Sequence, residues 1–148
     1  MAAALAEAEN RIALDISLGV CRAFLDRGSG VLTEFTLANG RRADVIALDR
    51  DGRLTIVEIK SCRADFQSDR KWQDYLEFCD SFYFAVAADF PIGLLPAETG
   101  LMIADRWGAH IERHPEPVPL AGARRKAVLL RFALNASQRL RQLVDPPI

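Results

Sequence analysis

Histidine and cysteine are scarce in this chain of 148 residues, with two and three copies. The three cysteines form no C-x-x-C pair, which excludes a disulfide framework and a zinc knuckle and favours a reducing cytosol. Long apolar runs are also lacking, since the longest, 82–88, falls far short of the ~20 residues of a membrane span. The first ten residues carry no basic side chain and so do not resemble a signal peptide. We therefore expect a cytoplasmic protein with no membrane partner.

The chain also has no excess of positive or negative charge, because it contains 19 basic and 20 acidic residues and its formal net charge is −1. This balance excludes a histone-like polycation and a disordered acidic tail. It also argues at first against a nucleic-acid partner. The charges are segregated, however, since residues 122–144 hold six basic side chains and no acid. One face of the protein is therefore suited to DNA, although the sum is near zero.

The length fits one domain over residues 1–148, and the hydrophobic pattern predicts an α/β fold. Helical periodicity marks three segments: 5–26, 65–79 and 122–144. Apolar or alternating runs predict six strands: 31–37, 42–48, 54–60, 81–88, 101–104 and 109–113. The first three strands are antiparallel, because turn signals at 39–40 and 49–52 join them. The unit from 54 to 88 predicts a parallel crossover, and the whole predicts a sandwich around a mixed sheet.

Both later helices carry a predicted inward stripe. On helix 65–79 the stripe consists of Trp72, Tyr75, Leu76 and Cys79. On helix 122–144 it consists of Leu129, Phe132, Ala133, Ala136, Leu140 and Leu143. Each stripe repeats at the spacing of an α-helix, so each predicts one buried face.

Charged side chains interrupt two of the predicted strands. Glu58 and Lys60 share one face of strand 54–60, and Asp44 lies within the apolar run of strand 42–48. Buried charges are costly unless they are paired or bind a metal. The hairpin brings Asp44 close to Lys60 or to Glu58, depending on the register. The alternative is a solvated sheet face, on which Glu58 and Lys60 pair with each other or with Arg42 and Asp44.

A fourth charged residue, Glu9, lies within the apolar stripe of the first helix. It either points inward to the same place or favours the helix dipole. If Glu9, Asp44, Glu58 and Lys60 converge, they provide what a metal-dependent phosphodiesterase needs. Carboxylate oxygens hold Mg²⁺ or Mn²⁺, and a lysine orients water or offsets charge on the phosphate.

Asp44, thirteen further residues and then Glu58-Ile59-Lys60 resemble the core signature of the PD-(D/E)xK nuclease superfamily. Five longer segments resemble the MmcB-like DNA repair proteins of alphaproteobacteria: 40–45, 57–61, 69–75, 78–80 and 123–126. The resemblance implies a restriction-endonuclease-like fold and a role in DNA repair. It implies metal binding by Asp44 and Glu58 and catalysis by Lys60, and Glu9 matches the helix-borne acid of many members.

Basic residues predict where DNA would lie. The last helix offers Arg124, Arg125, Lys126 and Arg131, and the segment after the signature adds Arg63, Arg70 and Lys71. The alternative for these residues is a solvated helix face. The predicted function is a Mg²⁺- or Mn²⁺-dependent DNA endonuclease in repair. The alternative is a catalytically silent nuclease fold that binds DNA or a repair-protein partner.

Overall fold

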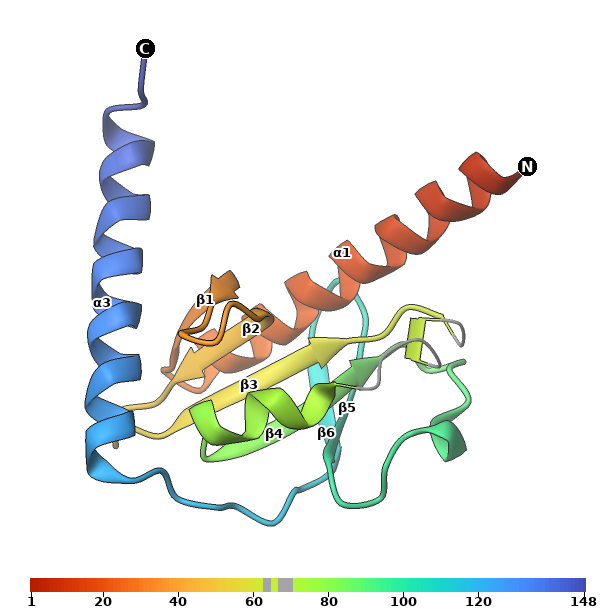
Figure 1. Ribbon diagram of the computed structural model, residues 1–148. Coiled ribbons are helices and arrows are strands. Elements are labelled where there is room, and N and C mark those ends of the chain that lie inside the picture. The colour runs from red at the N-terminus through yellow and green to blue at the C-terminus, as the bar shows by residue number, and fades with distance from the viewer. Residues whose placement is uncertain (63–64, 67–70) are drawn as a thin grey trace.

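The computed structural model describes residues 1–62, 65–66 and 71–148 and contains a mixed sheet with helices on both faces (Figure 1). The helical elements are α1 (Ala2–Asp26), η1 (Trp72–Phe78), η2 (Ile92–Leu94) and α3 (Gly122–Val144). The strands are β1 (Gly30–Thr36), β2 (Arg42–Leu48), β3 (Leu54–Ile59), β4 (Ser81–Val86), β5 (Gly100–Ala104) and β6 (Ala109–Arg113). Each predicted strand is present, and the predicted α/β class is confirmed.

The sheet has its six strands in chain order, β1-β2-β3-β4-β5-β6. Strands β1, β2 and β3 form an antiparallel meander, as the turn signals predict. Gly40 and Gly52 have φ of 84° and 83° in the two turns, a conformation that glycine adopts at low cost. Strand β4 lies parallel to β3, which confirms the predicted crossover, and β5 continues the parallel pairing. β6 then returns antiparallel to β5.

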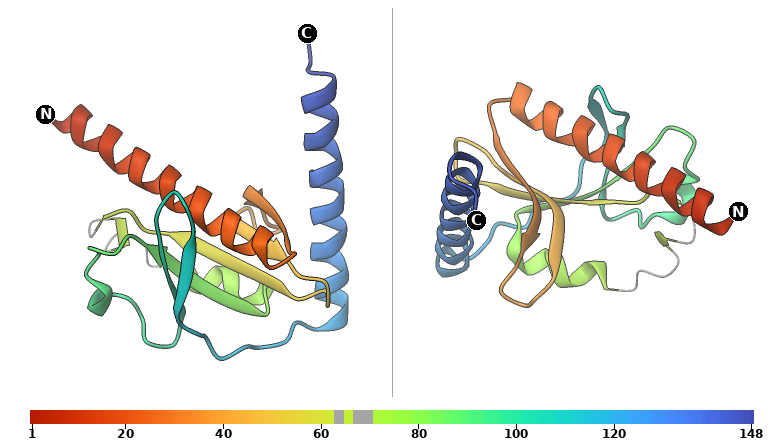
Figure 2. Two further views of the ribbon diagram at one scale, coloured as in Figure 1. Left: turned by 180° about the vertical axis from the view of Figure 1, so that it is seen from behind. Right: turned by 90° about the horizontal axis from the view of Figure 1, so that it is seen from above.

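Each face of the sheet is covered by its own set of apolar side chains. Helix α1 covers one face, where Ile16, Val20 and Phe24 pack with Val57 and other strand residues. Element η1 and the first turns of α3 cover the other face. The view from above shows α1 and η1 on opposite sides of the strands (Figure 2). Helix α1 also packs very closely against the hairpin between β5 and β6. Only glycine fits at position 19 there, because a Cβ would overlap a backbone oxygen of that hairpin.

Within the helix predicted over 65–79, the described residues 72–78 form a helix of a different kind, whereas residues 67–70 lie outside the described residues. Residues 72–78 form a 3₁₀-helix, in which side chains three residues apart share a face. Trp72, Tyr75 and Phe78 are accordingly the buried residues of η1, whereas Leu76, predicted to face inward, is 43% exposed. An α-helix, with 3.6 residues per turn, would place Leu76 on the same face as Trp72 and Tyr75. A 3₁₀-helix has three residues per turn, so Leu76 lies on another face and its predicted burial is wrong.

Helix α3 has the predicted bounds, but its predicted inward stripe is wrong beyond the first turns. Val128 and Phe132 are buried, whereas Leu140 and Leu143 are 63% and 81% exposed. Figure 1 gives the reason, since the C-terminal half of α3 extends past the sheet and has no layer to cover. None of the described helices has the length and apolarity that a membrane span requires. The cytoplasmic location stays a prediction.

Candidate functional site

A cleft of about 1130 Å³ opens where β2 and β3 separate, beside the N-terminal half of α1. The described ladder between these strands ends at the pair Val45 and Val57. Elements α1, β1, β2 and β3 all contribute to the lining. The charged residues of the lining are Glu9, Glu34, Arg42, Asp44, Glu58, Lys60 and Asp65. The four residues predicted to converge, Glu9, Asp44, Glu58 and Lys60, all line this cleft, Glu9 as an exposed residue of α1.

Two hydrogen bonds between side chains and backbone join β2 to β3 beyond the end of the ladder. The backbone N–H of Asp44 donates to Oε1 of Glu58 at 3.0 Å. The backbone N–H of Ile59 donates to Oδ2 of Asp44 at 2.8 Å. Each carboxylate thus takes a hydrogen bond from the opposite strand and has its orientation fixed. The register, which the sequence left open, places Asp44 level with Glu58.

Burial decides between the two interpretations of the charged strand. Glu58 and Lys60 are only 6% and 5% exposed, so the alternative of a solvated face is wrong for both. The ammonium nitrogen of Lys60 lies 3.8 Å from Oδ1 of Asp65. The backbone N–H of Lys60 donates to the carbonyl oxygen of Ala85 at 3.0 Å. Lys60 is therefore held in place by the sheet, and protein covers nearly all of its surface where it lines the cleft.

The electrostatics of the cleft disfavour the charged form of its central acid. Burial raises the pKa of Asp44, and the hydrogen bond from the Ile59 N–H opposes that rise. The negative charge of Glu34 raises this pKa further, and the positive charge of Lys60 lowers it. The net direction is upward. Because burial and the charge of Glu34 both disfavour ionised Asp44, a cation beside this carboxylate would be stabilising.

The donor set is suited to a hard divalent cation. Among the described residues, no group of three or more His, Cys, Asp or Glu has the arrangement of a complete metal site. Mg²⁺ is commonly held by one or two carboxylates with water in its other positions. Asp44 and Glu58, oriented by their hydrogen bonds, meet that smaller requirement. The pair thus fits Mg²⁺ or Mn²⁺ better than it fits a structural zinc ion, which takes four Cys or His ligands.

Glu34 is a residue of the cleft that sequence reasoning missed. Its φ is 52°, although it lies in the middle of β1, between the pairs Thr33–Val45 and Phe35–Ala43. This register puts it level with Asp44 on the adjacent strand. A non-glycine residue in this conformation costs about 1–3 kcal/mol, and such strain clusters at functional sites. Strand periodicity gives no sign of a positive φ, so the sequence held no signal for it.

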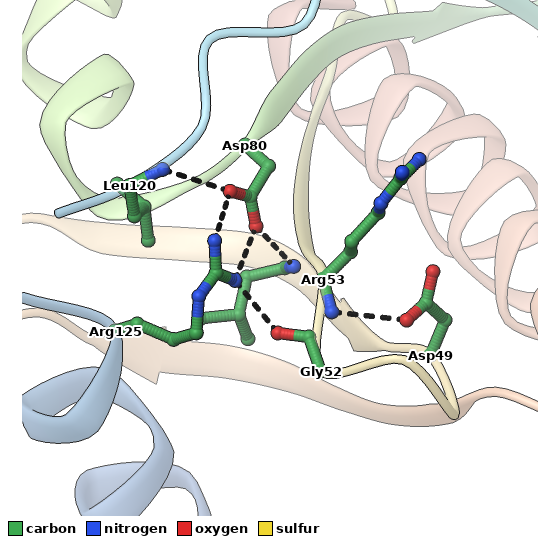
Figure 3. A network of polar contacts seen from close by, with 7 residues as sticks. Asp49, Gly52, Arg53, Asp80, Leu120 and Arg125 are labelled. Atoms are coloured by element: carbon green, nitrogen blue, oxygen red, sulfur yellow. Dashed lines mark hydrogen bonds and ion pairs between the residues drawn. The ribbon is translucent and has the colours of Figure 1, made fainter. Parts of the chain in front are cut away.

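Two of the predicted DNA-binding arginines of α3 have partners in the protein. Arg125 binds Asp80, which is 6% exposed, through two contacts of 2.6 and 2.8 Å. The same carboxylate accepts hydrogen bonds from the N–H groups of Leu54 and Leu120, and Arg125 also donates to the oxygen of Gly52 (Figure 3). This network connects α3 to the sheet, so Arg125 has a structural role.

Arg124 lies over the ring of Phe78 at 4.7 Å and within 3.5 Å of Glu77. Lys126 and Arg131 are exposed on α3, and Lys71 is exposed where η1 begins. Two further predicted DNA contacts, Arg63 and Arg70, lie outside the described residues. The exposed cations of α3 thus remain candidates for DNA contact.

Three comparisons with known proteins bear on the family to which the chain belongs. A family model described as DNA repair protein MmcB-like matches residues 2–147. A search of curated proteins finds no match. The solved structure of SPO1766, a protein of unknown function from Silicibacter pomeroyi, is 46% identical with a TM-score of 0.88. The match covers 90% of this chain and 92% of that one. The chain therefore belongs to the MmcB-like family of DNA repair proteins.

Proposed function

We propose that the cleft is the active site of a DNA endonuclease with a restriction-endonuclease-like fold, dependent on Mg²⁺ or Mn²⁺. One observation carries the proposal: Asp44 and Glu58 are fixed by hydrogen bonds to each other's strands, next to the buried Lys60. Paired carboxylates and a lysine in one cleft are the side chains that metal-dependent phosphodiester hydrolysis requires. Family membership supports DNA as the substrate class.

Each residue of the cleft has a distinct task in this proposal. Asp44 and Glu58 hold the cation, and Glu9 supports them from α1. When bound, the cation polarises the scissile phosphate and lowers the pKa of an attacking water. Lys60 orients that water and offsets the negative charge that develops on the phosphate. Its burial strengthens this effect, because water screens the ammonium less.

The charge of the cleft supports dependence on a cation. Five carboxylates line the described cleft, against two basic side chains, Arg42 and Lys60. A DNA phosphate that enters such a cleft meets net repulsion. A divalent cation held by Asp44 and Glu58 would reduce that repulsion, so we expect DNA to bind the cleft much more tightly when the metal is present.

A second candidate function is a non-catalytic module that binds DNA or a repair protein. The C-terminal half of α3 favours it, because this half extends from the body and exposes Leu140 and Leu143 beside basic residues. Exposed apolar side chains with adjacent charge are typical of interaction surfaces. A binding surface on this helix end is also compatible with an active cleft, since the two involve different residues, so the absence or presence of cleavage is what separates the two candidates.

A cleavage assay on branched, nicked, flap and single-stranded DNA tests the proposal. Wild type is compared with Glu58→Ala and Lys60→Ala in Mg²⁺, Mn²⁺ and EDTA. We expect cleavage with either metal, none in EDTA, and a loss of about 100-fold or more in each variant. Glu112→Gln is the matched control, because it removes an exposed acid outside the cleft.

Activity that survives both cleft variants would point to another site or a contaminant. Binding without cleavage across the whole panel would favour the non-catalytic module.

A further inference from the structure

Glu34 is held in an unfavourable conformation that the stability of the fold does not explain. It is the single non-glycine residue with a positive φ in the described part of the chain. Its carboxylate forms a contact of 2.6 Å with Nε of Arg42, but both side chains are more than half exposed. Exposed ion pairs contribute little, so this one does not offset the backbone strain.

The backbone at position 34 has its own support. Arg139, far along α3, donates to the carbonyl oxygen of Glu34 at 3.0 Å. Any amino acid at this position would accept that bond, and glycine would do so without strain. The carboxylate of Glu34 is thus the feature that requires an explanation, and the Arg42 guanidinium is its contact.

Arg42 combines a fixed backbone with an exposed side chain. The hydroxyl of Tyr75 donates to the carbonyl oxygen of Arg42 at 3.1 Å. The Arg42 side chain is 67% exposed and lines the cleft, as does Asp44 two residues further along β2. A guanidinium matches a phosphate with two parallel hydrogen bonds, and in the free protein its contact with Glu34 is made at Nε. A phosphate at the cleft can therefore compete for Arg42.

We propose that Arg42 binds a backbone phosphate of the DNA strand that enters the cleft, and that Glu34 holds its guanidinium there until the phosphate displaces the carboxylate. Glu34 is thus a competitor of the phosphate in this scheme, because its carboxylate occupies the Arg42 guanidinium in the free protein and must be displaced before Arg42 can bind DNA. The inference rests on the proposed function only in taking DNA as the ligand of the cleft. It does not depend on cleavage.

Fluorescence anisotropy with a labelled DNA duplex tests the exchange, in EDTA and in Ca²⁺, over a series of salt concentrations. Arg42→Gln is expected to weaken binding about tenfold and to reduce the salt dependence by about one phosphate contact. Glu34→Gln frees the guanidinium and is expected to tighten binding about threefold to tenfold. Glu112→Gln, which removes an exposed acid paired with His110, controls for net charge and is expected to change little.

The double variant Glu34→Gln/Arg42→Gln distinguishes exchange from simple repulsion of DNA by Glu34. Exchange predicts that the double variant binds like Arg42→Gln alone, because Glu34 acts through Arg42. A tightening that persists without Arg42 would overturn the inference, and so would a wild type that binds no DNA. If the Arg42 dependence is found but no cleavage is, the proposed nuclease activity fails and this inference stands.

Discussion

The network around Asp80 yields the most quantitative prediction, and the perturbation is Asp80→Asn. The carboxylate is 6% exposed and accepts four hydrogen bonds: two from Arg125 and one from each N–H of Leu54 and Leu120. Burial alone would raise its pKa, but these bonds and the charge of Arg125 outweigh burial and lower the pKa to about 2. The ionised form is therefore strongly favoured in the folded state.

The size of the effect follows from that pKa. A fall from 3.8 to about 2 corresponds to roughly 2 kcal/mol of stability from ionised Asp80. The Arg125 side chain is 26% exposed, so solvent screening reduces this to roughly 1–2 kcal/mol. In Asp80→Asn the amide NH₂ group would face N–H donors, so buried donors would lose their acceptor. This adds about 1–3 kcal/mol to the loss of stability. We expect a total loss of about 2–5 kcal/mol, a large share of a typical domain's stability.

Urea unfolding at several pH values measures this loss. Because the folded pKa of Asp80 is depressed, its contribution is complete above pH 3.8 and is lost as pH falls through about 2. The difference between wild type and Asp80→Asn should thus be constant near neutral pH and shrink below pH 4. Asp145→Asn is the control, since Asp145 and its partner Arg141 are both 73% exposed and should show no measurable loss. A loss for Asp80→Asn below about 0.5 kcal/mol, or one unchanged down to pH 2, would refute the reasoning.

Three further predictions concern folding and are tested by thermal or urea unfolding. Gly19→Ala should destabilise by about 2 kcal/mol or more, because its Cβ overlaps the backbone oxygen of Asp105, and wild-type stability would show that the hairpin can move away. Glu34→Gly should raise stability by about 1 kcal/mol through relief of strain, and a loss would mean that the carboxylate supports the fold. Leu143→Gln should leave the free energy of unfolding unchanged, because Leu143 is exposed, whereas Phe132→Ala should lower it by about 3 kcal/mol, because Phe132 is buried. Equal effects of the two substitutions would contradict the finding that the C-terminal half of α3 extends past the sheet.

Most of the fold was predictable because local signals and tertiary packing agree. The turns at Gly40 and Gly52 require positive φ, and the sequence supplies glycine at both. The failures occur where packing overrides periodicity. Residues 72–78 form a tighter helix than their apolar spacing indicated, and α3 continues past the sheet that would bury its stripe. Periodicity identifies the face of a helix, but not how far the neighbouring layer reaches.

The residues of the site were predictable where charged side chains interrupt apolar strands of the sequence. Charges within apolar strands are costly, and that cost identified Asp44, Glu58 and Lys60, which the structure brings to one cleft. Glu34 could not be found, because its role depends on a backbone angle. Arg125 was assigned to DNA because its buried partner, Asp80, is distant in the sequence. Long-range ion pairs leave no local pattern.

The claim that Asp44 and Glu58 hold a divalent cation is tested most directly by calorimetric titration of Mn²⁺ into the full chain. Wild type and the control Glu112→Gln are predicted to bind one ion with equal affinity. Asp44→Asn and Glu58→Gln are predicted to bind it at least tenfold more weakly, because each removes one of two charged ligands. Equal Mn²⁺ affinity in all four proteins, with the variants folded, would contradict the assignment of the cleft as a metal site.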